Sequence, residues 1–185
     1  MSAERFPLSD PALPVDPEAV TRALGAALAA RHEAGDPADG PALSLRDLAA
    51  HLVAAAEEHG GVVARGPLEG RELRELAGLA ARAVEGLPNE RPAVPVRPGL
   101  TLDHCMISTR GDVDVVGETV WGDRHLDLAA AAVGVAERFG SAVVAPLVEA
   151  YGGDGVDLLT LDACQQLNAV AAEVGWPVPG PPDRG

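Results

Sequence analysis

The residues with the greatest capacity for chemistry lie between Arg97 and Asp127, where carboxylate, imidazole and thiol side chains gather. Carboxylates can hold Mg²⁺ or move protons, and a thiolate beside an imidazole can act as a nucleophile. The candidates in this stretch are Asp103, His104, Cys105, Glu118, Asp123, His125 and Asp127. Their number and variety make this stretch the first place to look for a site.

Three kinds of site can be assembled from these candidates. His104 and Cys105 could form a nucleophile pair, but neighbours in an extended segment point to opposite faces. His104, His125 and Glu118 could converge on a metal ion, although no close ligand spacing supports it. Asp103 and Glu118 could instead hold one Mg²⁺. A fourth interpretation makes all of them polar loop residues, and the sequence leaves these alternatives open.

The elements around these candidates follow from hydrophobic periodicity. Two short apolar runs, at residues 105–108 and 113–116, are separated by turn-forming residues, so we expect a β-hairpin. Asp16 followed by Pro17 predicts a helix start, and Ser44 with Asp47 resembles a capping box. We expect helices over about 17–31, 45–59 and 69–85 before the hairpin, and over about 124–139, 141–151 and 156–174 after it.

This order of elements predicts a mainly α protein with a small β-hairpin, an α+β fold. The length of 185 residues suggests one domain. We expect a flexible N-terminal arm over residues 1–16, a domain over 17–175 and a Pro-rich tail over 176–185.

The charge balance excludes two classes of partner. The 14 basic residues are all Arg, against 28 acidic residues, and the net charge of −14 argues against a nucleic acid or an anionic membrane as partner. No apolar run approaches the ~20 residues of a membrane span, and the first ten residues do not resemble a signal peptide. Cys105 and Cys164 are far apart and indicate buried free thiols, so we expect a cytoplasmic protein. His32, His51 and His59 are expected to be solvated.

Residues 122–129, with the sequence G-D-R-H-L-D-L-A, resemble a motif of the aminoglycoside phosphotransferase family, within the protein-kinase-like superfamily. That family has H-G-D-x-x-x-x-N, a strand, a turn, a second strand ending in I-D, and then G-D-x-x-x-D-L-A. The segment from Leu100 to Ser108 matches this order in spacing and hydrophobicity. The resemblance extends from about Val20 to Ala172 and implies the helical C-terminal lobe of the family's fold. The strand-rich nucleotide lobe finds no counterpart, so we expect a C-terminal lobe alone.

The family's catalytic positions are changed in this sequence. The H-G-D motif falls on residues 97–99, which puts Gly99 at the catalytic Asp position. The metal-binding Asn position is His104, and the metal-binding Asp position falls at Gly117, with Glu118 beside it. Imidazole is a poor ligand for Mg²⁺, and glycine has no side chain to offer.

Asp123 and Asp127 of the motif remain, where we expect a helix cap and a carboxylate in the first helical turn. The resemblance therefore implies a truncated pseudo-phosphotransferase that acts as a binding or regulatory protein, with no intact catalytic residue, no metal and no cofactor. The alternative is a small-molecule kinase with rewired metal ligands, or one whose nucleotide lobe comes from a partner chain. We expect a protein partner or a second copy, and a small-molecule ligand is also compatible. The residues expected to border the partner's face are Leu100, Leu102, Ile107 and Trp121.

Overall fold

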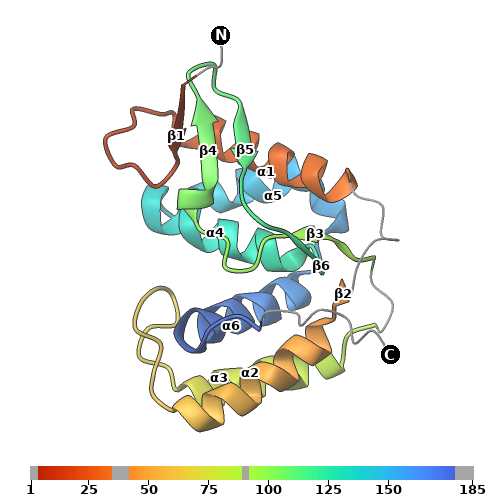
Figure 1. Cartoon of the computed structure of the whole chain (residues 1–185). Helices are drawn as coiled ribbons and strands as arrows, with labels where there is room; N and C mark the ends of the chain where they lie inside the picture. The colour runs from red at the N-terminus through yellow and green to blue at the C-terminus, as the bar shows by residue number, and fades with distance from the viewer. Residues whose placement is uncertain (1–3, 35–41, 89–91, 178–185) are drawn as a thin grey trace.

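The computed structural model describes residues 4–34, 42–88 and 92–177, and every structural statement below refers to these ranges. The helices form two groups (Figure 1). The upper group contains α1 (Pro17–Glu33), α4 (His125–Phe139) and α5 (Val144–Gly152), and the lower group contains α2 (Leu45–His59), α3 (Leu73–Glu85) and α6 (Leu158–Val174). Helix α4 packs against α6 and joins the two groups.

Two small sheets accompany the helices. β1 (Arg5–Pro7), β4 (Cys105–Ser108) and β5 (Val113–Val115) form an antiparallel sheet in the order β1-β4-β5. In the second sheet, β6 (Val120–Gly122) lies between β2 (Ala42–Leu43), which is parallel to it, and β3 (Val94–Val96), which is antiparallel. The loop over residues 97–104 runs from β3 to β4 and therefore connects the two sheets. The predicted α+β fold class and the hairpin are confirmed.

The helix starts follow the predicted capping chemistry. Asp16 accepts hydrogen bonds from the backbone N–H groups of Glu18 and Ala19, and Ser44 Oγ accepts one from Asp47 N. Helix α3 starts at Leu73 rather than near residue 69, because the preceding residues form a turn closed by a bridge between residues 62 and 72.

The structure differs from the sequence-based prediction near both ends of the chain. Residues 5–7, expected in a flexible arm, pair with β4, and Leu8 is buried in the core of the upper group. Trp176, expected in a frayed tail, packs against the core of the lower group, whereas residues 178–185 lie outside the described residues. Apolar side chains in both segments bury area against the helices, and this holds them to the domain.

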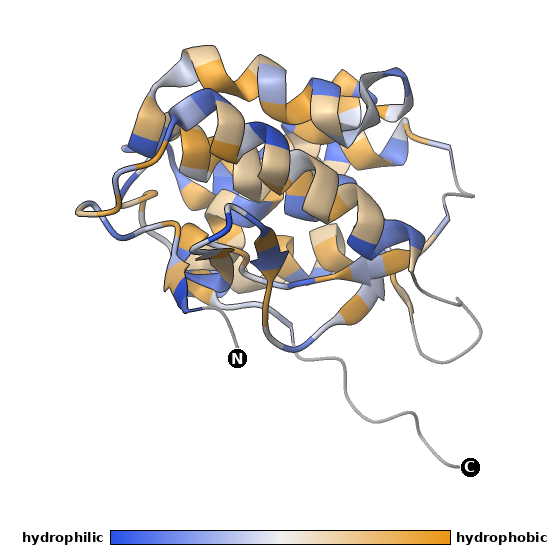
Figure 2. Cartoon of the chain, turned by 90° about the horizontal axis from the view of Figure 1, so that it is seen from above, coloured by the Kyte–Doolittle hydropathy of each residue, from blue (hydrophilic) through white to orange (hydrophobic). Residues whose placement is uncertain are grey.

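The apolar side chains form two core clusters, one in each group of helices. Helices at the surface carry both apolar and polar residues, as amphipathic helices do (Figure 2). Leu100, Leu102 and Ile107 are buried in the upper cluster and Trp121 is half-buried, so the expectation that they border an exposed face is wrong for the first three. The exposed large apolar side chains of the described residues are instead Val62, Val116, Leu158 and Leu159.

None of the helices in the described ranges combines the length and the apolar character that a bilayer crossing requires.

A close approach of α1 to α5 depends on Gly25. A Cβ atom at this position would clash with the backbone carbonyl oxygen of Leu147, which cannot move away as a flexible side chain could. We predict that Gly25→Ala lowers the free energy of unfolding by about 1–3 kcal/mol, the usual cost of overpacking, as measured by urea denaturation.

Gly78 in α3 is the matched control, because its nearest neighbour would be the mobile end of Arg82, 3.5 Å from the added Cβ. Gly78→Ala should raise stability by about 0.5–1 kcal/mol through helix propensity alone. Equal effects of the two substitutions would contradict the packing of α1 on α5.

Candidate functional site

The loop between β3 and β4 is held by one buried carboxylate. Asp127, in the first turn of α4, is 1% exposed. Its Oδ1 and Oδ2 atoms lie 2.9 and 3.2 Å from the backbone nitrogen of Arg97, which donates to them. This bond fixes the start of the loop that carries Gly99 and His104, so the retained motif aspartate positions the candidate site.

A second partner of Asp127 comes from α1. His32 Nε2 lies 3.3 Å from Asp127 Oδ2, and His32 Nδ1 lies 2.8 Å from the hydroxyl of Tyr151 in α5. The expectation that His32 is solvated is therefore wrong, because it sits inside the upper group and bridges two helices. Burial raises the pKa of Tyr151 to about 12, so its hydroxyl stays protonated at neutral pH.

Asp123 and His125 form a separate buried pair. Asp123 Oδ1 accepts from His125 N at 2.9 Å and lies 2.6 Å from His125 Nδ1. On the other side of the ring, Asp157 N donates to His125 Nε2 at 3.1 Å. The proton of the neutral ring therefore sits on Nδ1. The N-cap residue of α4 is Arg124, without a side-chain cap bond, so Asp123 is not the expected cap but binds the first residue of the helix, and His125 links the start of α4 to the start of α6.

Gly99, which the resemblance would align with a catalytic aspartate, has a φ of +66°, a left-handed conformation that glycine adopts most easily. The indole of Trp176 lies beside it, and an added Cβ would be 3.3 Å from Trp176 Nε1. The space next to this backbone position is therefore bordered by an aromatic N–H donor, where phosphoryl transfer needs a carboxylate acceptor.

Gly117, which the resemblance would align with a metal-binding aspartate, faces the side chain of Arg97. A Cβ at Gly117 would lie 2.9 Å from both Cζ and Nε of Arg97, and the φ of Gly117 is +112°. The guanidinium thus occupies the space that a side chain at position 117 would need. A guanidinium therefore lies beside the residue that the resemblance would align with a carboxylate.

His104 is engaged by its own loop. Its Nδ1 accepts from Thr101 N at 3.1 Å and lies 3.0 Å from Thr101 Oγ1. Burial, and then the nearby charge of Arg97, lower the pKa of His104, so the ring is neutral at pH 7. Burial also raises the pKa of the adjacent Cys105 to about 12. Both shifts oppose a thiolate–imidazolium pair, so the geometry gives no support to a nucleophilic Cys–His site.

The remaining candidates are not brought together as a metal site. Both ring nitrogens of His125 are hydrogen-bonded, which removes it from the set of His104, His125 and Glu118. Asp103 bonds to Ser9 Oγ, and Glu118 lies exposed after β5. In the part of the chain that the structure describes, no group of three His, Cys, Asp or Glu side chains could hold a metal ion.

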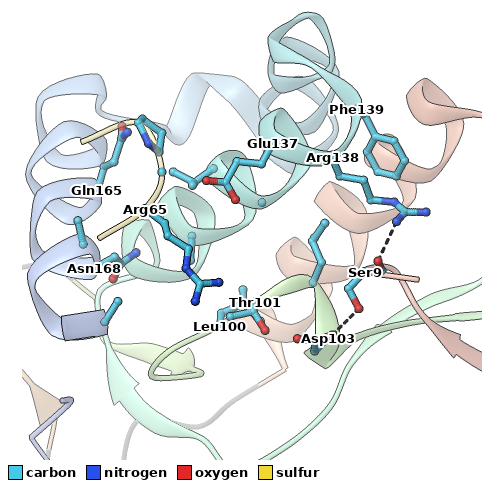
Figure 3. A pocket seen from close by; sticks show the side chains of 18 of the residues that line it. Ser9, Arg65, Leu100, Thr101, Asp103, Glu137, Arg138, Phe139, Gln165 and Asn168 are labelled. Atoms are coloured by element: carbon cyan, nitrogen blue, oxygen red, sulfur yellow. Dashed lines mark hydrogen bonds between the residues drawn. The ribbon is translucent and has the colours of Figure 1, made fainter. Parts of the chain in front are cut away.

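A cavity of about 1,010 Å³ opens beside the same loop. Its walls come from the N-terminal segment, the turn at residues 65–68, the loop at 100–103, and helices α4 and α6 (Figure 3). Most of the lining is apolar, from Pro11, Leu13, Val15, Leu68, Leu100, Leu102, Val133, Phe139 and several alanines. No local sequence motif joins these distant segments, so the cavity could not be predicted from the sequence.

Eight of the lining residues are polar, and four of these carry charged side chains. Arg65 and Glu137 extend toward its interior (Figure 3), and among the described residues neither forms an ion pair. Asn168 donates through Nδ2 to Leu126 O at 2.9 Å, while its Oδ1 is buried and has no partner in the described ranges. Arg138 holds the N-terminal wall by donating to the carbonyl oxygens of Ser9 and Asp10.

Comparison with solved structures identifies the architecture. The chain superposes on an aminoglycoside phosphotransferase from Streptomyces rimosus, in complex with ADP and streptomycin, with a TM-score of 0.70, 17% identity, and coverage of 95% of this chain and 69% of that one. An aminoglycoside-3'-phosphotransferase of type VIII gives a TM-score of 0.67 at 17% identity, covering 83% of this chain and 61% of that one. A macrolide 2'-phosphotransferase of type I gives 0.59 at 21% identity, covering 86% and 53%.

The chain has the fold of the aminoglycoside phosphotransferases. The resemblance inferred from G-D-R-H-L-D-L-A is thereby confirmed for the fold. The chain spans 53% to 69% of the length of these phosphotransferases, and the identities of 17% to 21% speak only to architecture. No protein-family model and no curated protein matches the sequence.

Proposed function

We propose that this phosphotransferase-like protein binds ligands without transferring phosphoryl groups, as a pseudo-phosphotransferase in a binding or regulatory role. The observation that carries the proposal is the guanidinium of Arg97, which lies against Gly117, the residue that the resemblance would align with a metal-binding aspartate. Phosphoryl transfer depends on metal ions that neutralise the phosphates and on a carboxylate that orients the nucleophile. Gly99, His104 and Gly117 supply neither.

At Gly117 a metal ion would lack a carboxylate ligand and would also be repelled by the positive charge of Arg97. Two unit charges about 4 Å apart interact by about 4 kcal/mol at an effective dielectric constant near 20, so a divalent cation beside Arg97 would be repelled by roughly 8 kcal/mol. The neutral ring of His104 offers no compensating charge. A Mg²⁺ ion in this place would therefore need carboxylates that the described residues do not bring to it.

The binding half of the proposal rests on the cavity beside the loop. A volume of about 1,010 Å³ matches the size of a small-molecule pocket, and its lining is mostly apolar with eight polar residues. Glu137 extends into the cavity and forms no ion pair with a described residue, so its carboxylate would accept a hydrogen bond from such a ligand. We therefore favour a small molecule with an apolar body and a hydrogen-bond donor, over a protein partner or a second copy of the chain.

The absence of phosphoryl transfer is tested with Mg-ATP. Calorimetry should detect no micromolar binding, and a phosphate-release assay with and without an aminoglycoside should show no turnover. Gly99→Asp should stay inactive, because the other two positions and Arg97 are unchanged. Micromolar nucleotide binding that is lost in His104→Ala or Glu118→Ala, but kept in the exposed control Glu58→Ala, would contradict the proposal and support a phosphotransferase with rewired metal ligands.

The cavity is tested with the fluorescent probe anilinonaphthalene sulfonate. Ala130 lines the cavity from α4, so Ala130→Phe should fill part of it and weaken probe binding by about tenfold or more, equivalent to a loss of about 1.4 kcal/mol. Ala26→Phe, on the exposed face of α1, should leave probe binding unchanged. Thermal denaturation checks that both variants fold, and equal probe binding by the two folded variants would argue against this cavity as the binding site.

A further inference from the structure

We propose that the turn after β5 binds a phosphate-like anion directly, without a metal ion, through Arg97 and Arg31. The inference rests on the proposed function, because it assigns an anion to the place where an active phosphotransferase would hold Mg²⁺. It also goes further, because it names the charge and the chemical class of a ligand outside the apolar cavity.

Arg97 offers a guanidinium with no competing partner. Its backbone N–H is bound by Asp127, but its side chain forms no ion pair or hydrogen bond with any described residue. Its Nε is buried without an acceptor, and the group lies against Gly117, where the absence of a Cβ leaves room for it. A buried donor without an acceptor costs free energy. The Nη1 and Nη2 atoms of Arg97 are not among the buried atoms and have no partner in the described ranges, so they are the donors that an anion would contact.

Arg31, in the last turn of α1, reaches the same short segment. Its Nη1 donates to Val115 O at 2.7 Å, while its Nε and Nη2 are buried and have no partner among the described residues. Because Val115 and Gly117 are two residues apart, the two guanidinium groups flank one turn. Burial and then the Asp127 carboxylate raise the pKa of the Cys105 thiol, whereas the charges of Arg97 and Arg31 lower it.

His104 adds a third donor at this turn. Its carbonyl oxygen accepts from Val116 N at 2.9 Å, which places the residue beside the segment that the arginines flank. Since its Nδ1 accepts a hydrogen bond from Thr101 N, the proton of the neutral ring sits on Nε2. The neutral ring of His104 therefore carries an N–H donor on a residue that borders this turn.

The nearby carboxylates are engaged elsewhere or exposed. Asp127 uses its oxygens for Arg97 N and His32, and Asp103 bonds to Ser9. Glu118 lies exposed beside the turn and forms no ion pair with a described residue. Neither guanidinium group forms an ion pair with an acidic residue of the described ranges, so the two together form an anion-binding arrangement.

The chemistry of guanidinium favours a tetrahedral oxyanion. Its planar set of N–H donors matches two oxygens of a phosphate or phosphomonoester, and such charge-assisted bonds are about twice as strong as neutral ones. In a metal-dependent site, carboxylates hold a cation that contacts the phosphate oxygens. In the proposed site, N–H donors of the protein contact these oxygens directly, and no metal ion lies between them.

Inorganic phosphate in the presence of EDTA is the direct probe. Titration calorimetry should detect millimolar or tighter binding that added Mg²⁺ does not strengthen. Arg97→Gln should weaken binding by about tenfold, as the loss of a charge-assisted hydrogen bond implies. Arg110→Gln, at the exposed hairpin turn, should have no effect. Arg31→Gln is a second test, with circular dichroism to check folding, and Arg97→Gln stands alone if that variant unfolds.

The following results would contradict the proposed anion site. Undetectable phosphate binding, equal losses in Arg97→Gln and Arg110→Gln, or a requirement for Mg²⁺ would each do so, and acetate binding as tightly as phosphate would overturn the assigned class. These failures differ from those of the proposed function, which are Mg-ATP-dependent phosphoryl transfer, micromolar nucleotide binding that depends on His104 or Glu118, and a cavity that does not bind the probe.

Discussion

The carboxylate of Asp127 is the interaction on which the site depends. It is buried at the start of α4, binds the backbone of Arg97 and contacts His32 from α1. Leaving either buried partner without this acceptor would cost about 1–3 kcal/mol. One side chain therefore fixes the loop between the two sheets relative to α1 and α4, whether or not the loop performs catalysis.

A loop that is held in this way can keep its backbone conformation without carrying catalytic side chains. The fold needs the Asp127 contact and the packing of Leu100 and Leu102, which are buried. It does not need a carboxylate at Gly99 or Gly117, where left-handed backbone and close neighbours leave little room for one. The residues that hold the fold differ from those that catalysis would need. A phosphotransferase architecture is therefore compatible with the proposed binding function.

The sequence predicted the parts of the structure that are local. Asp16 and Ser44 predict the starts of their helices, because a cap contacts backbone groups no more than three residues away. The hairpin was predictable from two apolar runs separated by a turn. The G-D-R-H-L-D-L-A motif placed Asp127 in a first helical turn for the same reason. The partners of Asp127 were not predictable, since His32 is 95 residues away in the chain and nothing local marks it as buried.

The remaining differences also come from long-range contacts. Arg97 was aligned to a motif position, yet its packing on Gly117 depends on how β3 lies beside the segment before β6. Trp176 reaches Gly99 from beyond the last helix, and Leu8 is buried because β1 pairs with β4. Hydrophobic periodicity describes the face of one element, whereas these contacts arise from the arrangement of several.

The central claim is that cationic and neutral donors occupy the place of the metal ligands, and paramagnetic Mn²⁺ tests it most directly. In an isotope-labelled sample titrated with Mn²⁺, the account predicts that the amide signals of Arg97, His104 and Gly117 broaden no more than those of the buried core. Selective broadening of these three signals, reversed by EDTA and abolished in Glu118→Ala, would show a metal ion at the turn and contradict the account.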